Sequence, residues 1–272
     1  MFKYIISLFF FITCDHSKPQ LEMPTSYRLD KPSSEWEMPK KLVEISGISV
    51  LNFPNILSVN DEEGKLYEYN LETKEVEDHY KFGKDGDYED LAINGNTVYV
   101  LKSNGTIYEI NDFKKNPKVE KYKTFLSEKY DTEGLYFDKG NYRLLVACKE
   151  EIEIDGVDKN VIYEFDLKTN TLNESPAYTI SKDNFKFNTK KHDFAPSGLA
   201  IHPQTNTLYI ISSVGKLMVE MNQEGEILSK YTLDYPHFIQ PEGIFFTDNG
   251  DLYISNEGKK KRGNILKFDY ID

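Results

Sequence analysis

Short apolar runs alternate with polar turns along the chain from about residue 46 to its end. The runs are rich in Val, Ile, Leu, Tyr and Phe, residue types that favour β-strands. Several of the turns contain glycine in hairpin-forming contexts, as in NGN, SNG and DNG. This pattern predicts an all-β body. Residues 1–13 differ from it, because they form one apolar stretch behind a lysine.

Five segments share one order of elements: a polar residue, Gly or Asp, an apolar strand, a turn, a second strand, another turn and an aliphatic–aromatic third strand. Successive segments begin 43, 44, 64 and 45 residues apart, at Ser46, Glu89, Glu133, Ser197 and Glu242. Fourth strands are visible in VEKYKTF and ILSKYTL, after the second and fourth segments. Four-stranded units of this length are the blades of a β-propeller.

The 64-residue step is too short for two blades and predicts one blade with insertions at 151–160 and around 182–194. The first insertion is expected to be a solvated loop with a turn at Asp155-Gly156. We therefore predict five blades over residues 27–272, and six blades are the alternative. The fifth segment ends at its third strand, so a strand around residues 27–30, or one reaching residue 37, is expected to close it. Trp36 is expected to pack on this strand.

The first residues of the chain have the features of an export signal. One lysine precedes a stretch of about ten mostly apolar residues, too short to span a bilayer as a helix. Cys14 follows this stretch and resembles the acylated cysteine of a bacterial lipobox. We expect a signal peptide over 1–13, lipidation of Cys14 and a flexible tether over 14–26, and hence export and attachment to a bacterial membrane. A secretory signal cleaved elsewhere is the alternative.

Composition narrows the classes of partner. The formal charge is −12, which argues against binding to a nucleic-acid backbone. The chain has two cysteines, so lipidation of Cys14 would leave Cys148 without a disulfide partner. The sequence lacks a Gly-rich phosphate loop, HExxH and GxSxG, and we expect no organic cofactor. His192, His202 and His237 lie in loop-like sequence and are expected to face solvent. We expect a monomer, whose small-molecule or envelope-protein partner is unknown.

The repeats bring chemistry to one end of the predicted channel. The first strand of each propeller blade lines the channel, so the residues that open these strands gather near one mouth. The turns after the second strands reach the same mouth. Oxygen donors of this kind suit Ca²⁺ or Mg²⁺. The candidate metal ligands are Glu89, Glu133, Glu242, Asp61, Asn256 and Glu257. Other polar residues expected there are Ser46, Lys102, Lys149, Ser197 and Ser212.

Two alternatives to a metal site remain open at this mouth. Like charges that lie close together repel one another unless something compensates them. Lys102 and Lys149 occupy equivalent turn positions and could pair with the glutamates in place of a cation. The polar side chains could also serve only to satisfy hydrogen bonds at the ends of strands.

The repeat motifs resemble the SdiA-regulated (YjiK-like) family. They are SGI…VNDE, DYEDLAI, DTEGLYFD…ACKE, PSGLAIHP…GKLMVEMNQEGEI and PEGIFFTDNGDLYISNEG, over roughly residues 42–270. The resemblance implies a five-bladed propeller in exported or membrane-anchored bacterial proteins, with a calcium-type ion near the channel mouth. This chain departs from the family pattern at Ser212 and Ser213, where acidic residues are common, and at Asp90, where the other units have Gly.

Three functions are compatible with this sequence. The first is a non-catalytic, membrane-anchored binding module with a divalent cation at the channel mouth. The second is a metal-dependent hydrolase of lactones, esters or phosphoesters at the same site, in which one free carboxylate acts as the base. The third is an envelope-interaction protein that uses its rim loops. The fold alone does not choose between them.

Overall fold

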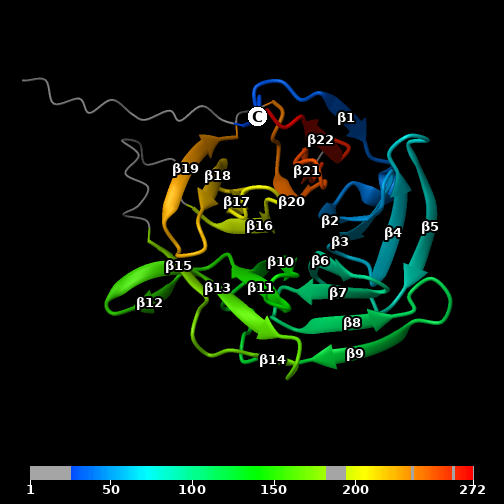
Figure 1. Ribbon diagram of the computed structural model, residues 1–272. Helices are drawn as coiled ribbons and strands as arrows, with labels where there is room; N and C mark the ends of the chain where they lie inside the picture. The colour runs from blue at the N-terminus through cyan, green and yellow to red at the C-terminus, as the bar shows by residue number, and fades with distance from the viewer. Residues whose placement is uncertain (1–25, 182–193, 234–235, 259–260, 272) are drawn as a thin grey trace, which may run out of the picture.

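The computed structural model describes residues 26–181, 194–233, 236–258 and 261–271. Five separate antiparallel sheets stand around a central axis and form a five-bladed β-propeller (Figure 1). The prediction of five blades is confirmed, and the six-bladed alternative is wrong. Residues 1–25, which include the predicted signal and Cys14, lie outside the described residues, as does most of the second insertion.

Blades 1 and 2 have four strands each, and a short 3-10 helix, η1 (Lys40–Leu42), precedes them. Their strands are β2 (Ile45–Asn52), β3 (Asn55–Asn60), β4 (Lys65–Asn70), β5 (Glu75–Lys81), β6 (Tyr88–Asn94), β7 (Thr97–Lys102), β8 (Ile107–Asn111) and β9 (Lys118–Tyr122). Blade 3 consists of β10 (Thr132–Asp138), β11 (Arg143–Cys148), β12 (Ile152–Ile154), β13 (Val157–Asp166), β14 (Thr171–Leu172) and β15 (Tyr178–Ser181).

Blade 4 has four strands, and blade 5 combines three strands from the end of the chain with one from its beginning. The strands are β16 (Pro196–Ile201), β17 (Leu208–Ser212), β18 (Leu217–Met221), β19 (Ile227–Thr232), β20 (Pro241–Phe246), β21 (Leu252–Asn256), β22 (Asn264–Phe268) and β1 (Ser34–Glu37). The predicted fourth strands after the second and fourth repeats are thus confirmed as β9 and β19.

The innermost strands of the five blades form a closed ring around the channel. Each of β2, β6, β10, β16 and β20 is the innermost strand of its sheet. Each also contacts the inner strand of both neighbouring blades, so the ring is continuous (Figure 1). Because every inner strand begins at the same end of the ring, the residues that open the strands are brought together there.

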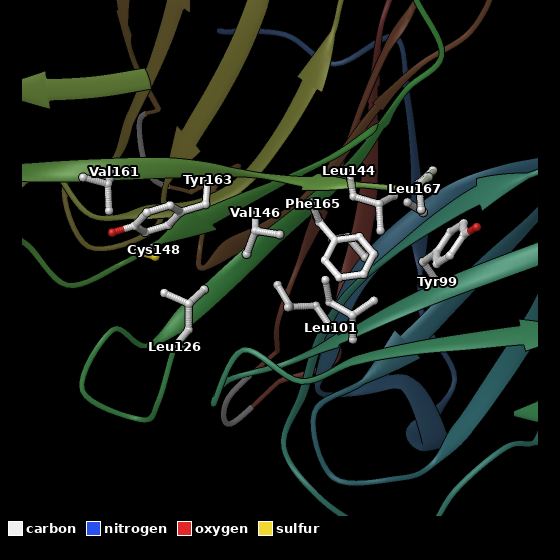
Figure 2. Close-up of a cluster of buried hydrophobic side chains, with 13 residues drawn as sticks. Tyr99, Leu101, Leu126, Leu144, Val146, Cys148, Val161, Tyr163, Phe165 and Leu167 are labelled. Carbon is white, nitrogen blue, oxygen red and sulfur yellow. The ribbon is translucent and has the colours of Figure 1, made fainter. Parts of the chain in front are cut away.

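The hydrophobic core is divided into five clusters, one at each contact between neighbouring blades. Figure 2 shows the cluster between blades 2 and 3, where Leu101 faces Val146 and Phe165. Phe165 is fully buried, and burying a side chain of this size contributes about 1.5–3 kcal/mol. Because each blade has core on both of its faces, its strands carry apolar side chains on both faces.

The ring is closed by β1, which pairs antiparallel with β22. The predicted closure by an N-terminal strand is confirmed, but the strand covers residues 34–37 and not 27–30. Tyr27 instead packs into the core, where its hydroxyl donates a hydrogen bond to the carbonyl of Gly250 at 2.6 Å. Trp36 stacks on Tyr253 of β21 and donates to the carbonyl of Leu71 in blade 1 at 2.7 Å, so the closing strand also joins two blades.

The first insertion of blade 3 is a hairpin rather than a loop. Strand β12 pairs with the first residues of β13 around Asp155-Gly156, and both of these turn residues have positive φ. Two such residues form the tight turn that suits the twist of a hairpin. The prediction of a turn here is confirmed, and the prediction of an unpaired loop is wrong. Among the described residues, no helix is long and apolar enough to cross a membrane.

Each inner strand begins with a register irregularity against its neighbour strand, and glycine makes room for it. A Cβ atom at Gly198 would lie 2.3 Å from the carbonyl oxygen of Glu242, and one at Gly243 would lie 2.7 Å from that of Ser46. Real Cβ atoms do not approach backbone this closely, so neighbouring blades touch here through bare backbone. This packing explains why glycine follows the opening polar residue in four of the five repeats.

We predict that Gly198→Ala destabilises the protein by about 1–3 kcal/mol, the usual cost of overpacking a tight contact. Gly140→Ala is the matched control, because its Cβ would meet nothing closer than 3.4 Å. Urea unfolding followed by circular dichroism measures both. Equal stability of the two variants would show that the inner strands tolerate a wider spacing than the structure has.

Candidate functional site

The mouth at which the five inner strands begin is called here the glutamate mouth. Its opening residues sit within the register irregularities of their strands. An irregularity of this kind re-aims the side chain of the extra residue away from the regular pleat. The residues placed in this way are Ser46, Glu89, Glu133, Ser197 and Glu242.

Glu133 has a lysine partner. The Nζ atom of Lys149 lies 2.6 Å from Oε1 of Glu133 and 3.3 Å from Oδ2 of Asp131. Glu133 is buried and Lys149 is about one-third exposed (32%). Burial of Lys149 lowers its pKa, but the two carboxylates outweigh this effect and raise the pKa above the usual range. For this glutamate, the structure has the lysine pairing that the sequence left open.

Glu89 and Glu242 have no ion pair within the described residues. Burial raises the pKa of both carboxyl groups above the usual range, and the nearby Glu133 raises both further. Each is also near enough to other acids to be affected, Glu89 by Asp87 and Glu242 by Glu257. The three glutamates therefore lie in one electrostatic environment, in which Gln240 and Lys149 compensate Glu242 only in part and no basic group pairs with Glu89 within the described residues.

A second acidic group lies where blade 5 meets blade 1. Burial, with the neighbouring Glu44 and Glu257, raises the pKa of Asp61 to about 7. The Oδ1 atom of Asp61 is buried without a hydrogen-bond partner in the described structure. Asn256 is 1% exposed, and both polar atoms of its side chain lack partners there as well. Buried polar atoms are nearly always paired, so unpartnered ones of this kind suit a ligand.

The other predicted polar residues hold the blades together. The Ser197 hydroxyl donates to the carbonyl of Pro241 at 2.8 Å, and the Ser212 hydroxyl accepts from the backbone N–H of Ala195 at 3.0 Å. Ser46 contributes its carbonyl, which accepts from the Ser255 hydroxyl of blade 5 at 2.8 Å. These serines satisfy hydrogen bonds between neighbouring strands and blades.

Lys102 does not pair with a glutamate. Its Nζ atom lies 5.2 Å from the ring centroid of Tyr88, and it makes no ion pair in the described parts of the chain. Lys102 and Lys149 thus have different partners, although they occupy equivalent turn positions in their repeats. In the same blade, Asp90 takes the place of the glycine, and its carboxylate accepts from the N–H groups of Leu91 and Leu135, both at 2.7 Å. Asp90 therefore joins blade 2 to blade 3.

A cavity of about 370 Å³ opens beside the paired glutamate. It brings together the predicted residues Glu133, Lys149, Ser197 and Glu242 with residues that sequence reasoning missed. The missed residues are Val214, Lys216 and Gln240. Lys216 donates to the carbonyl of Ile239, and the Gln240 amide donates to Glu257.

Sequence reasoning also missed the acids that stand two positions before the opening residues. Asp87 and Asp131 precede Glu89 and Glu133 in this way, Glu44 precedes Ser46, and Gln240 stands in the same place before Glu242. The three acids raise the pKa of nearby carboxyl groups, whereas Gln240 lowers that of Glu242 through a hydrogen bond. Extending the repeat alignment by two residues towards the N-terminus would have revealed these equivalent polar positions.

The donor set at this mouth fits a cation only in part. Its oxygen atoms suit a hard cation, and Asp61 and Asn256 present unpartnered buried atoms. However, among the described residues no three Asp, Glu, His or Cys side chains stand close enough to hold one metal ion together. An ion held here would therefore have to keep several of its own water molecules, as Mg²⁺ does.

His202 is buried, so the expectation that it faces solvent is wrong. Its Nδ1 accepts the backbone N–H groups of Gln204 and Thr205, both at 3.2 Å, and burial lowers its pKa. Cys148 is also buried, and burial raises the pKa of its thiol to about 12. Neither side chain is placed for catalysis at the glutamate mouth.

Comparison with known protein families agrees with the repeat pattern. The profile of the SdiA-regulated family matches residues 43–260. The chain belongs to this family. The match covers all five inner strands, so the family resemblance includes every residue that opens the glutamate mouth. A search of curated proteins finds no significant match.

Solved structures share the fold of this family member at low sequence identity. Glutaminyl cyclase from Myxococcus xanthus has a TM-score of 0.59 and 12% identity, covering 89% of this chain and 97% of its own. Virginiamycin B lyase from Staphylococcus aureus has a TM-score of 0.51 and 13% identity, covering 88% of each chain.

We predict that, with chelator present, stability falls as pH rises between about pH 4 and pH 8. The unfolded chain loses the protons of Asp61 and Glu242 in the lower part of this range, while the folded chain holds them until the pH reaches their raised pKa values of about 7 and about 8. The folded state then binds more protons, so each rise in pH favours unfolding. Thermal melting in chelator across this range measures the slope.

Glu242→Gln is expected to flatten this slope, because the amide has no proton to lose. Glu128→Gln is the matched control, since Glu128 is exposed and lies outside the mouth. A slope that is the same in both variants and the parent chain would contradict the assignment of the slope to the glutamate mouth.

Proposed function

We propose that this protein is an exported, membrane-anchored binding propeller whose glutamate mouth holds a divalent cation that takes part in binding a ligand. The observation that carries the proposal is the excess of carboxyl groups over positive charges at this mouth. Glu89 and Glu242 are partly buried and lack ion pairs within the described residues. A buried carboxylate without a counter-charge is costly, so the group either keeps its proton or takes up a cation.

The candidate ligands form two neighbouring groups. Glu89 and Glu242 flank the channel, and the charge of Glu257 raises the pKa of Glu242. Glu257 also affects Asp61, which links the channel to the group at the contact of blades 5 and 1. A cation held here would supply positive charge to both groups and a site at which a ligand oxygen can bind. The residues that would hold it are Glu89, Glu242, Glu257, Asp61 and Asn256.

Lys149 supports binding over hydrolysis. A metal-dependent hydrolase needs a carboxylate that serves as the base in addition to the metal ligands. Lys149 pairs with both Glu133 and Asp131, and its single positive charge balances one of these two negative charges. The mouth therefore offers few free carboxylates, and binding a cation uses those that remain.

The hydrolase is the second candidate, and the raised pKa of Glu242 favours it, because such a group can exchange protons near neutral pH. A panel of a lactone, a carboxylic ester and a phosphoester separates the two functions. Turnover that Glu242→Gln abolishes while the metal content stays the same would favour the hydrolase over the binding module.

We predict that Mg²⁺ or Ca²⁺ raises the melting temperature at pH 8 by about 5–10 °C when the ion is at 100 times its Kd. The shift should be smaller at pH 5, where the carboxyl groups hold protons that the ion must displace. Elemental analysis of the purified protein is the accompanying measurement. Absence of both bound metal and any shift with either ion would contradict the cation site.

Asn256→Ala and Glu242→Gln are expected to reduce the metal-dependent shift, while Ser212→Ala should lower stability without altering it. Ser212 bonds only to the backbone in the described structure, at Ala195 and Gly215. The serine variant therefore separates loss of the metal from general weakening of the mouth.

We predict that Cys14→Ser abolishes incorporation of labelled palmitate when the full chain is expressed in a bacterium that processes lipoproteins. The apolar stretch before Cys14 and the polar segment after it motivate this prediction. Cys148→Ser is the matched control, because Cys148 is fully buried in blade 3 and should leave labelling unchanged. Labelling that persists in the Cys14 variant would refute the anchor.

A further inference from the structure

The opposite mouth of the channel contains a cavity of about 700 Å³, larger than the one at the glutamate mouth. All five inner strands contribute to its lining. Ile48, Leu91, Leu135 and Ile244 form its inner part, and each is at most 5% exposed. Ligand pockets usually have volumes of about 300–1,000 Å³ and mostly apolar walls. This mouth, called here the apolar mouth after the side chains of its inner part, has the size of such a pocket, and its lining combines these apolar side chains with polar residues nearer the rim.

Five partly exposed apolar side chains surround the apolar mouth, one from each blade. They occupy the same place in every repeat, four residues after the residue that opens the glutamate mouth. Each packs against a different one of the five core clusters, and this contact with the core fixes the position of its side chain. Exposed apolar surface that is contiguous marks binding sites. The five are Val50, Ile93, Phe137, Ile201 and Phe246.

The apolar mouth carries little net charge, in contrast to the glutamate mouth. Asp138 is buried but pairs with Arg143 at 2.9 Å, so its charge is compensated. The other charged lining residues are Lys139 and Asp248, which are exposed and opposite in sign. The rim also presents the amides of Asn141 and Gln223. A cavity whose charges balance and which has an apolar ring and an amide rim suits an uncharged ligand with one polar end.

The chain enters the propeller beside this mouth. Ser26 accepts a hydrogen bond from the backbone of Ile271, and the Tyr27 ring lies 6.2 Å from that of Phe246. If Cys14 is lipidated, as the proposed function holds, residues 14–25 reach at most about 40 Å. The anchor would then keep the apolar mouth close to the membrane surface, where uncharged amphipathic molecules accumulate.

We propose that the apolar mouth is a second binding site, which takes an uncharged amphipathic small molecule with its apolar part in the ring of five side chains. This site uses none of the residues of the glutamate mouth. Only the argument about its distance from the membrane rests on the proposed function. The site itself would stand if neither a metal nor an anchor were found.

The test uses Nile red, an uncharged apolar dye, and the mature chain carrying Cys14→Ser, which needs no detergent. We expect saturable binding of one dye per chain, with the blue-shifted fluorescence of an apolar site. Ser49→Trp fills the cavity and Phe137→Ser removes part of its wall, because both residues line it. Each variant is expected to weaken binding at least tenfold, and thermal melting shows which of them is folded.

Two controls locate the dye. Leu228→Ser removes an apolar side chain that is 46% exposed on the outer strand β19, and it should leave binding unchanged. Glu133→Gln should also bind the dye as the parent does, whatever it does to a cation. Absence of saturable binding, binding unchanged in both cavity variants, or equal loss in Glu133→Gln would each overturn the proposal.

Discussion

Three glutamates from three blades share one mouth of the channel, and within the described residues only Glu133 is paired with a lysine. The rest of the functional account depends on this imbalance of charge. Burial and mutual repulsion raise the pKa values of Glu89 and Glu242, so in the absence of a cation the mouth would retain protons at a pH at which exposed carboxylates have lost them. A cation offers the other way of balancing these charges. The mouth is therefore a place where proton binding and cation binding compete.

The fold imposes this imbalance through its geometry. The register irregularity at the start of each inner strand turns the opening side chain towards its neighbours, and backbone contacts at Gly198 and Gly243 hold the blades at one spacing. Closure by β1 fixes the ring, because Trp36 joins the last blade to the first. The same strands present polar residues at one mouth and apolar residues at the other, so one repeat produces two mouths with opposite chemistry.

The fold could be predicted from the sequence because the apolar runs repeat at the length of a blade. The closing strand lies only in the second part of the predicted segment, because Tyr27 packs into the core, whereas the strand consists of polar residues around Trp36. The gathering of the glutamates also followed from the repeats. The partners of the glutamates could not be predicted in this way. Lys102 and Lys149 occupy equivalent positions in their repeats, yet Lys149 pairs with Glu133 while Lys102 lies over the ring of Tyr88.

The central claim is that protons and a divalent cation compete for the buried carboxyl groups of the glutamate mouth. Carbon-13 NMR of labelled glutamate side chains, titrated with pH in chelator and again in Mg²⁺, tests it most directly. The account predicts that the carboxyl resonances of Glu89 and Glu242 titrate well above the usual range in chelator and shift towards it with Mg²⁺. Ordinary pKa values in chelator, or raised values that Mg²⁺ and Ca²⁺ both leave unchanged, would contradict it.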